Sequence, residues 1–121
     1  MRDPLVEDWI RYQVEHRKGI DHPLFSAWEK VNNIVRDDPE TGWTLTLALI
    51  EAAPDDGVLA NIAAGPLEDL LCRSPDRFLD RAEIQYRRDS KFHRCITGVW
   101  GLPEDFIDRL DKYTATVAKP S

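Results

Sequence analysis

WTLTLALI, at residues 43–50, is the one segment whose secondary structure the pattern leaves open. Its first residues alternate between apolar and polar side chains, as in a half-buried strand, but the segment is also apolar enough for a helix buried on most sides. The preceding Asp38-Pro39-Glu40 is typical of a helix start, and Glu51-Ala52-Ala53 is typical of a helix end. A lone strand would have no partner to pair with. We therefore predict a helix at 43–50 and an all-α fold.

Prolines predict the boundaries of the other helices. Proline has no N–H and a fixed φ, so it suits the first turn of a helix and disrupts a helix interior. Seven of the eight prolines divide the chain into pieces of helical length. About seven short helices result, and they begin near Pro4, Pro23, Pro39, Pro54, Pro75, Asp89 or Ser90, and Pro103. The fourth keeps one apolar face across Gly65-Pro66, which predicts either a kink there or a break and restart.

Apolar side chains recur every three or four residues within these segments, and we expect them to face the core. The expected core includes Val14 in the first helix, Trp28 in the second and Ile107 in the last. Helices joined by short turns pack as antiparallel neighbours, which predicts stacked hairpins in a short α-solenoid-like array or an irregular bundle. Residues 1–117 would form this single domain, and residues 118–121 a flexible tail.

The composition is that of an ordinary globular domain, with 42% hydrophobic and 31% charged residues over 121 positions. No apolar run approaches the ~18 residues of a membrane-spanning helix, and the N-terminus lacks the apolar core of a signal peptide. Cys72 and Cys95 have no metal-ligand or redox-pair spacing, which favours two buried thiols. We therefore expect a cytoplasmic protein with no membrane contact, no cofactor and no metal.

Charge is distributed unevenly along the chain, whose formal net charge is −6. The 36 residues from Asp37 to Cys72 contain eight acids and no Lys or Arg, whereas five basic residues outnumber two acids from Arg81 to Arg94. The two blocks either face each other within the fold or form two poles of its surface. The acidic balance argues against nucleic acid as a partner.

The segment AGPLEDLL, at residues 64–71, admits two interpretations. Glu68 and Asp69 could flank a kink and present carboxylates to a ligand or partner. Alternatively, a helix that restarts with Pro66 in its first position would place Glu68 in the third, where a carboxylate satisfies exposed N–H groups and complements the helix dipole. Local capping explains the position without any ligand, so the second interpretation is favoured.

A resemblance to a known family rests on three sets of residues: Trp28 and Val31 with Asp38-Pro39, the AGPLEDLL segment, and Phe92, Arg94, Val99, Trp100 and Gly101. In these residues the chain from about Trp28 to Trp100 is similar to an uncharacterised bacterial family of domains of unknown function. The resemblance implies a bacterial helical domain, and it implies no mechanism and no catalytic residue.

Size, acidity and the absence of a recognised catalytic motif favour a protein-binding module, such as an immunity or antitoxin-like inhibitor. Acids on a rigid helical surface would steer a partner that has a basic surface. The residues that we predict to bind this partner are Asp55, Asp56, Glu68 and Asp69, with Trp100 as a hydrophobic anchor.

Three alternatives stay open on the sequence. A buried Glu68 could belong to an enzyme with an unrecognised carboxylate site. The basic segment 81–94 could contact nucleic acid through its arginines and an aromatic side chain, although the arginines could equally pair with the acidic block. A structural or accessory subunit could dimerise through Trp9, Tyr12 or Trp100. Neither the partner nor the oligomeric state follows from the sequence.

Overall fold

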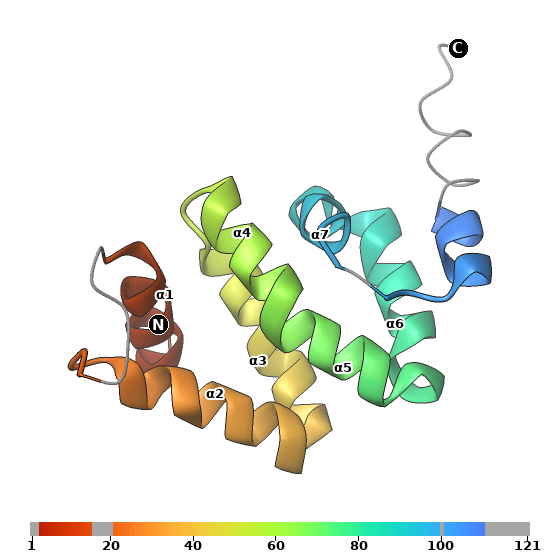
Figure 1. Ribbon diagram of the computed structural model, residues 1–121. Helices are drawn as coiled ribbons and strands as arrows, with labels where there is room; N and C mark the ends of the chain where they lie inside the picture. Colours follow the sequence, from red (N-terminus) through yellow and green to blue (C-terminus); the bar gives the residue numbers. More distant parts are fainter. Residues whose placement is uncertain (1–2, 16–20, 100, 111–121) are drawn as a thin grey trace.

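The computed structural model describes residues 3–15, 21–99 and 101–110, and within these ranges the chain forms helices and no strand (Figure 1). The elements are α1 (Pro4–Val14), α2 (Phe25–Asp37), α3 (Pro39–Ala52), α4 (Asp56–Ile62), η1 (Ala63–Leu67), α5 (Glu68–Arg73), α6 (Pro75–Arg88) and α7 (Ser90–Ile96). A further helix covers residues 104–110, and η1 is a π-helical turn. The all-α prediction is confirmed, while the predicted tail at 118–121 lies outside the described residues.

The predicted helix at 43–50 is confirmed as the centre of α3. Asp38 caps its start, where the carboxylate accepts a hydrogen bond from the Thr41 N–H at 3.3 Å. Because α3 packs against α1, α2, α7 and the segment from α4 to α5, it is covered on several sides. Thr46 is fully buried, and its hydroxyl donates to the Gly42 carbonyl oxygen at 2.7 Å. The strand-like alternation therefore belongs to a helix that buries one of its threonines.

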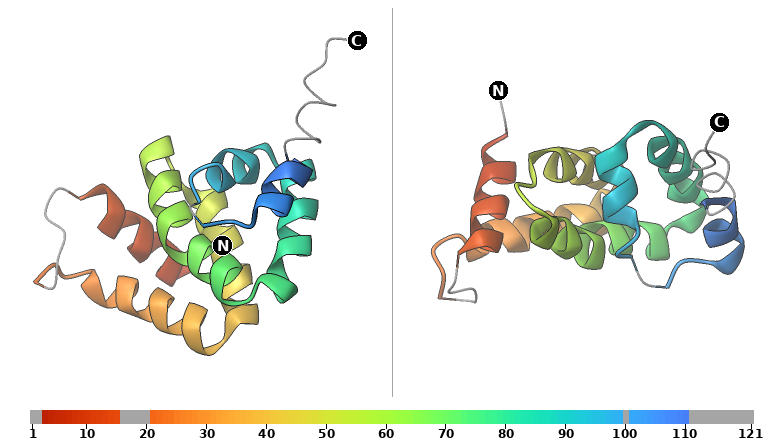
Figure 2. Two further views of the ribbon diagram at one scale, coloured as in Figure 1. Left: turned by 45° about the vertical axis from the view of Figure 1, so that its right-hand side comes forward. Right: turned by 90° about the horizontal axis from the view of Figure 1, so that it is seen from above.

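The elements α4, η1 and α5 form one continuous rod that lies against α3 (Figure 1). At one end of the molecule α1 and α2 pack on this pair, and at the other end lie α6 and α7 (Figure 2). Consecutive helices contact each other as predicted for hairpins, but α1 also packs on α3 and α4, and α7 on α3, α4 and η1. A solenoid repeat contacts only its neighbours. Of the two predicted arrangements, the fold is therefore the irregular bundle.

The rod passes Pro66 without the break and restart that were one predicted outcome. In a regular α-helix the Pro66 ring would collide with the carbonyl group of Ile62. The wider π turn of η1 accommodates the ring instead. Because the helix does not restart, Glu68 has no exposed amide groups to cap, and its own N–H donates to the Gly65 carbonyl oxygen. The predicted capping role of Glu68 is therefore wrong.

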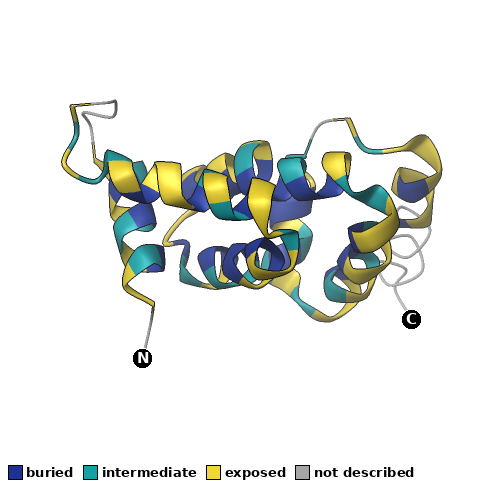
Figure 3. Cartoon of the chain, turned by 90° about the horizontal axis from the view of Figure 1, so that it is seen from below, coloured by how far each residue is buried: buried dark blue, intermediate teal, exposed yellow. Residues whose placement is uncertain are grey.

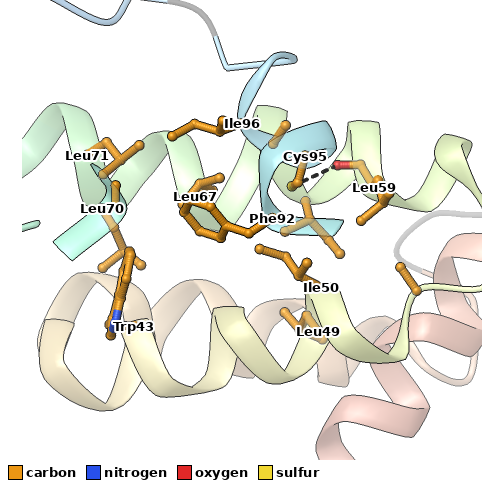
Figure 4. Close-up of a cluster of buried hydrophobic side chains, with 14 of the residues drawn as sticks. Trp43, Leu49, Ile50, Leu59, Leu67, Leu70, Leu71, Phe92, Cys95 and Ile96 are labelled. Carbon is orange, nitrogen blue, oxygen red and sulfur yellow. Dashed lines mark hydrogen bonds between the residues drawn. The ribbon is translucent and has the colours of Figure 1, made fainter. Parts of the chain in front are cut away.

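The core is one cluster of buried side chains to which every described helix contributes, and Figure 3 shows the buried residues on the inner sides of the helices. Trp43 of α3 stacks on Phe78 of α6, with ring centroids 5.4 Å apart. Leucines and isoleucines of α3 and the rod surround Phe92 of α7 (Figure 4). The largest side chains that are under 2% exposed include Phe78, Phe92, Phe106, Leu49, Ile50, Ile62, Leu67, Leu70, Leu71 and Ile96.

Three side chains that we expected in the core are exposed instead: Val14 (49%), Trp28 (38%) and Ile107 (40%). They belong to α1, α2 and the 104–110 helix, which lie at the two ends of the bundle, where fewer neighbours cover a wide apolar face. Trp28 stacks on Phe25, with ring centroids 5.3 Å apart. Cys95 is buried as predicted, but Cys72 is exposed because it lies outside the face of α5 that packs inward.

Two helical glycines give opposite expectations for replacement by alanine. A Cβ at Gly42 would lie 2.9 Å from the Val35 Cα, so α2 and α3 would have to move apart, at a cost of about 1–3 kcal/mol. A Cβ at Gly65 would meet nothing within 4 Å. Gly65→Ala is expected to raise the free energy of unfolding by about 0.5–1 kcal/mol, because alanine restricts the unfolded chain and favours the helix. Urea denaturation of Gly42→Ala and Gly65→Ala measures both changes, and a destabilised Gly65→Ala would contradict the open position.

Candidate functional site

The four acids predicted to bind a partner do not form one surface. They lie along the rod, where Asp69 follows Asp56 by 13 residues, or about 20 Å at 1.5 Å per residue. Asp56 faces α7, since its Oδ1 lies 3.8 Å from Nη2 of Arg94. Asp69 instead lines a groove beside α1 and α2. The predicted acidic surface is therefore divided between two faces of the molecule.

Asp55 and Glu68 have local surroundings that differ from those of the other two acids. The Asp55 carboxylate caps α4, because its Oδ1 accepts a hydrogen bond from the Val58 N–H at 2.9 Å. Glu68 is partly buried, and it lines neither of the two grooves described below. The predicted anchor Trp100 lies outside the described residues. Asp55 thus has a structural role, and Glu68 belongs to neither of these two grooves.

The surfaces predicted for dimerisation are part of the core. Trp9 is 2% exposed and Tyr12 is 6% exposed. Both side chains point from α1 toward the rest of the bundle, which buries them within one chain. The expectation that Trp9 or Tyr12 forms a contact between subunits is therefore wrong.

The acidic and basic blocks of the sequence face each other in the fold. Arg81 of α6 donates two hydrogen bonds to the Glu40 carboxylate of α3, at 2.5 and 2.9 Å, and this guanidinium lowers the pKa of Glu40. Lys91 of α7 donates from Nζ to the carbonyl oxygens of Glu51 and Ala53, both at 2.7 Å, at the end of α3. Carboxylates and carbonyl groups are therefore interleaved with the basic side chains of segment 81–94.

A groove of about 390 Å³ opens where α1, α2 and the π turn meet, and we call it the α1–α2–η1 groove. Its volume falls in the range of about 300–1,000 Å³ that is usual for ligand sites. The π turn forms one wall, and such turns are frequent at functional sites. The lining consists of aromatic, amide and small side chains with one carboxylate: Trp9, Gln13, Trp28, Asn32, Asn61, Ala64, Gly65, Pro66 and Asp69.

Several polar groups of this groove have no partner in the part of the chain that the structure describes. The Trp9 Nε1–H is buried and finds no acceptor there. The side chains of Asn32 and Asp69 likewise form no hydrogen bond or ion pair with any described residue. Gln13, in contrast, accepts a hydrogen bond from Asn61 at 2.9 Å, which joins α1 to α4. Asn32 and Asp69 are therefore the polar groups of the lining that are left to pair with a ligand.

A larger groove of about 530 Å³ lies between α4 and α7, but its polar groups are engaged with one another. Asp56 and Arg94 pair across it at 3.8 Å, and His93 stacks on Tyr86. The Cys95 thiol donates to a backbone carbonyl group of α4, and burial raises its pKa to about 12. A thiol with so high a pKa is not a nucleophile at neutral pH. The α1–α2–η1 groove is therefore the better candidate site.

Of the residues in the α1–α2–η1 groove, only Asp69 was among the residues predicted to bind a basic partner, and Trp9 was named only as a possible dimer contact. The signal for the others is a repeated spacing: Trp9 and Gln13 on α1, and Trp28 and Asn32 on α2, are each four residues apart. Residues at this spacing share one face of a helix. On both helices a tryptophan and an amide one turn later therefore line the groove together.

Comparison with known proteins places the chain in a family without assigning an activity. A model of a family of unknown function matches residues 15–117. No curated protein matches the chain, and no solved structure matches it.

Within the described ranges, no group of three or more His, Cys, Asp or Glu side chains could hold a metal ion. None of the described helices is long and apolar enough to cross a membrane.

Proposed function

The chain belongs to that family, DUF6869, and because the family's function is unknown we propose a function from the groove: a protein-binding module that holds a segment of a partner protein between α1, α2 and η1. The observation that carries this proposal is the pair of unpartnered side chains, Asn32 and Asp69, that line one groove with the partly exposed Trp28. Amide side chains both donate and accept, which is the pattern that a polypeptide backbone presents. An exposed tryptophan supplies the apolar anchor that is typical of interfaces.

An immunity or antitoxin-like inhibitor would be a special case of this function, in which the captured segment belongs to a toxic enzyme. The exposed carboxylate of Asp56, at the far end of the rod, would then contribute to steering a basic partner rather than to contact. We propose the cytoplasm as the place of this function, a location in which free thiols such as those of Cys72 and Cys95 stay reduced.

The alternatives have less support from the site. An enzyme centred on Glu68 would need that carboxylate in a pocket, and Glu68 lines neither groove. A nucleic-acid interface on segment 81–94 would need a contiguous basic face, and the Arg81 guanidinium is bound to Glu40.

Filling the groove is the direct test of this proposal. Gly65 lines the groove and has open space at the Cβ position, so Gly65→Leu would place a side chain in the groove without displacing the fold. Affinity capture from a cell lysate is expected to retain a partner on the unmodified protein and on Gly65→Ala, and at least about tenfold less on Gly65→Leu, a change of 1.4 kcal/mol. Circular dichroism checks that both variants are folded. Equal capture by Gly65→Leu and Gly65→Ala would show that the groove is not the binding site.

A further inference from the structure

The charge of the α1–α2–η1 groove is unbalanced. Among the described residues that line it, Asp69 alone is charged, and this carboxylate has no ion-pair partner in the described part of the chain. The other polar side chains of the lining are neutral amides and an indole. The groove therefore presents one negative charge that nothing described in the fold compensates, and a cationic group on a ligand would complement it.

The aromatic wall of the groove narrows the identity of that cation. Trp28 is 38% exposed and is supported by Phe25, against which it stacks with an interplanar angle of 24°. A tryptophan face attracts a cation, and a planar guanidinium can stack on the ring while it donates two parallel hydrogen bonds to a carboxylate. An ammonium group has neither the planar shape nor the paired donors. Trp28 and Asp69 on one groove thus match an arginine better than a lysine.

An unpartnered amide of the lining matches the backbone that carries such a side chain. Asn32, four residues after Trp28 on the same face of α2, has an amide that can pair with a peptide N–H and C=O. The amide and the carboxylate on one groove together favour a polypeptide segment over an isolated cation.

We infer that the α1–α2–η1 groove binds an extended polypeptide segment through one arginine, whose guanidinium lies between Trp28 and Asp69 while Asn32 pairs with the backbone of the segment. This inference rests on the proposed protein-binding function and adds the chemistry of the bound segment. The neighbouring carboxylate of Glu68 lies outside the groove and takes no part.

The test uses three blocked tripeptides as probes: acetyl-Ala-Arg-Ala-amide and its citrulline and lysine counterparts. Citrulline keeps the shape of arginine and removes its charge. Nitrogen–proton correlation spectra of the full chain follow the indole resonances of Trp9 and Trp28. We expect a saturable shift of both with the arginine peptide, because both side chains line the groove, and an affinity about tenfold lower for the citrulline peptide.

Two matched variants test which carboxylate binds the guanidinium. Asp69→Asn is expected to remove the preference for arginine over citrulline, whereas Glu68→Gln, which deletes the adjacent carboxylate outside the groove, keeps it. Equal effects of the two variants, or equal binding of the arginine and citrulline peptides, would overturn the inference and leave the groove as a binding site. Absence of any shift at Trp9 and Trp28 would also overturn it. The proposed function fails separately, if Gly65→Leu captures the partner as well as Gly65→Ala does.

Discussion

Phe92→Ala is expected to lower the free energy of unfolding by about 3–5 kcal/mol, a large part of the ~5–15 kcal/mol that stabilises a domain of this kind. Phe92 is 0% exposed, and its ring meets that of Trp43 at a centroid distance of 6.0 Å. The side chain joins α7 to α3 and to the rod, so its removal leaves a cavity between three elements that are each packed elsewhere. Urea denaturation followed by far-UV circular dichroism measures the loss.

Ile84→Ala is the matched control for this prediction. Ile84 lies on α6 and is 57% exposed, so its truncation should change the free energy of unfolding by no more than about 0.5 kcal/mol. A loss below about 1 kcal/mol for Phe92→Ala would mean that α7 is not packed against α3 as described. Equal losses in the two variants would contradict the assignment of the core.

The helix boundaries could be predicted from sequence because they depend on neighbouring residues. Asp3 accepts a hydrogen bond from the Leu5 N–H at 2.8 Å, and Asp89 accepts one from the Lys91 N–H at 3.0 Å. Each such contact spans a few residues and needs no tertiary structure. Two helices that follow a loop are exceptions: α2 begins at Phe25, and α6 at Pro75, without a hydrogen bond from a side-chain cap. His22 instead accepts a hydrogen bond from the Leu24 N–H, one turn before the helix.

The π turn and the candidate site could not be predicted in this way. Whether Pro66 breaks a helix or widens one turn depends on the neighbours that hold the rod straight, and these come from α2, α3 and α7. Asp56 and Asp69 share an acidic block in the sequence, but helical geometry turns them toward different neighbours. The groove exists only where α1, α2 and η1 meet, which is a property of the packing.

Alkaline pH is expected to destabilise the fold by about 4 kcal/mol through Cys95 alone. Burial raises the pKa of this thiol from 9.0 to about 12. Below pH 9 the thiol is protonated in the folded and in the unfolded chain, so its contribution to stability is fully present. As pH rises from about 9 to about 12, the unfolded chain loses the proton while the folded chain keeps it. The unfolded state therefore gains about 1.4 kcal/mol for each pH unit in that interval.

Cys95→Ser isolates this effect from the tyrosines and lysines that titrate in the same interval. A serine hydroxyl can still donate to the Leu59 carbonyl oxygen that the thiol contacts at 3.4 Å, but it does not ionise below pH 12. The difference in free energy of unfolding between the unmodified protein and Cys95→Ser, measured in urea at several pH values, should be constant up to pH 9 and then fall by about 4 kcal/mol. A difference that stays constant to pH 12 would mean that the thiol ionises as readily in the fold as outside it. Such a result would contradict the burial of Cys95 between α7 and α4.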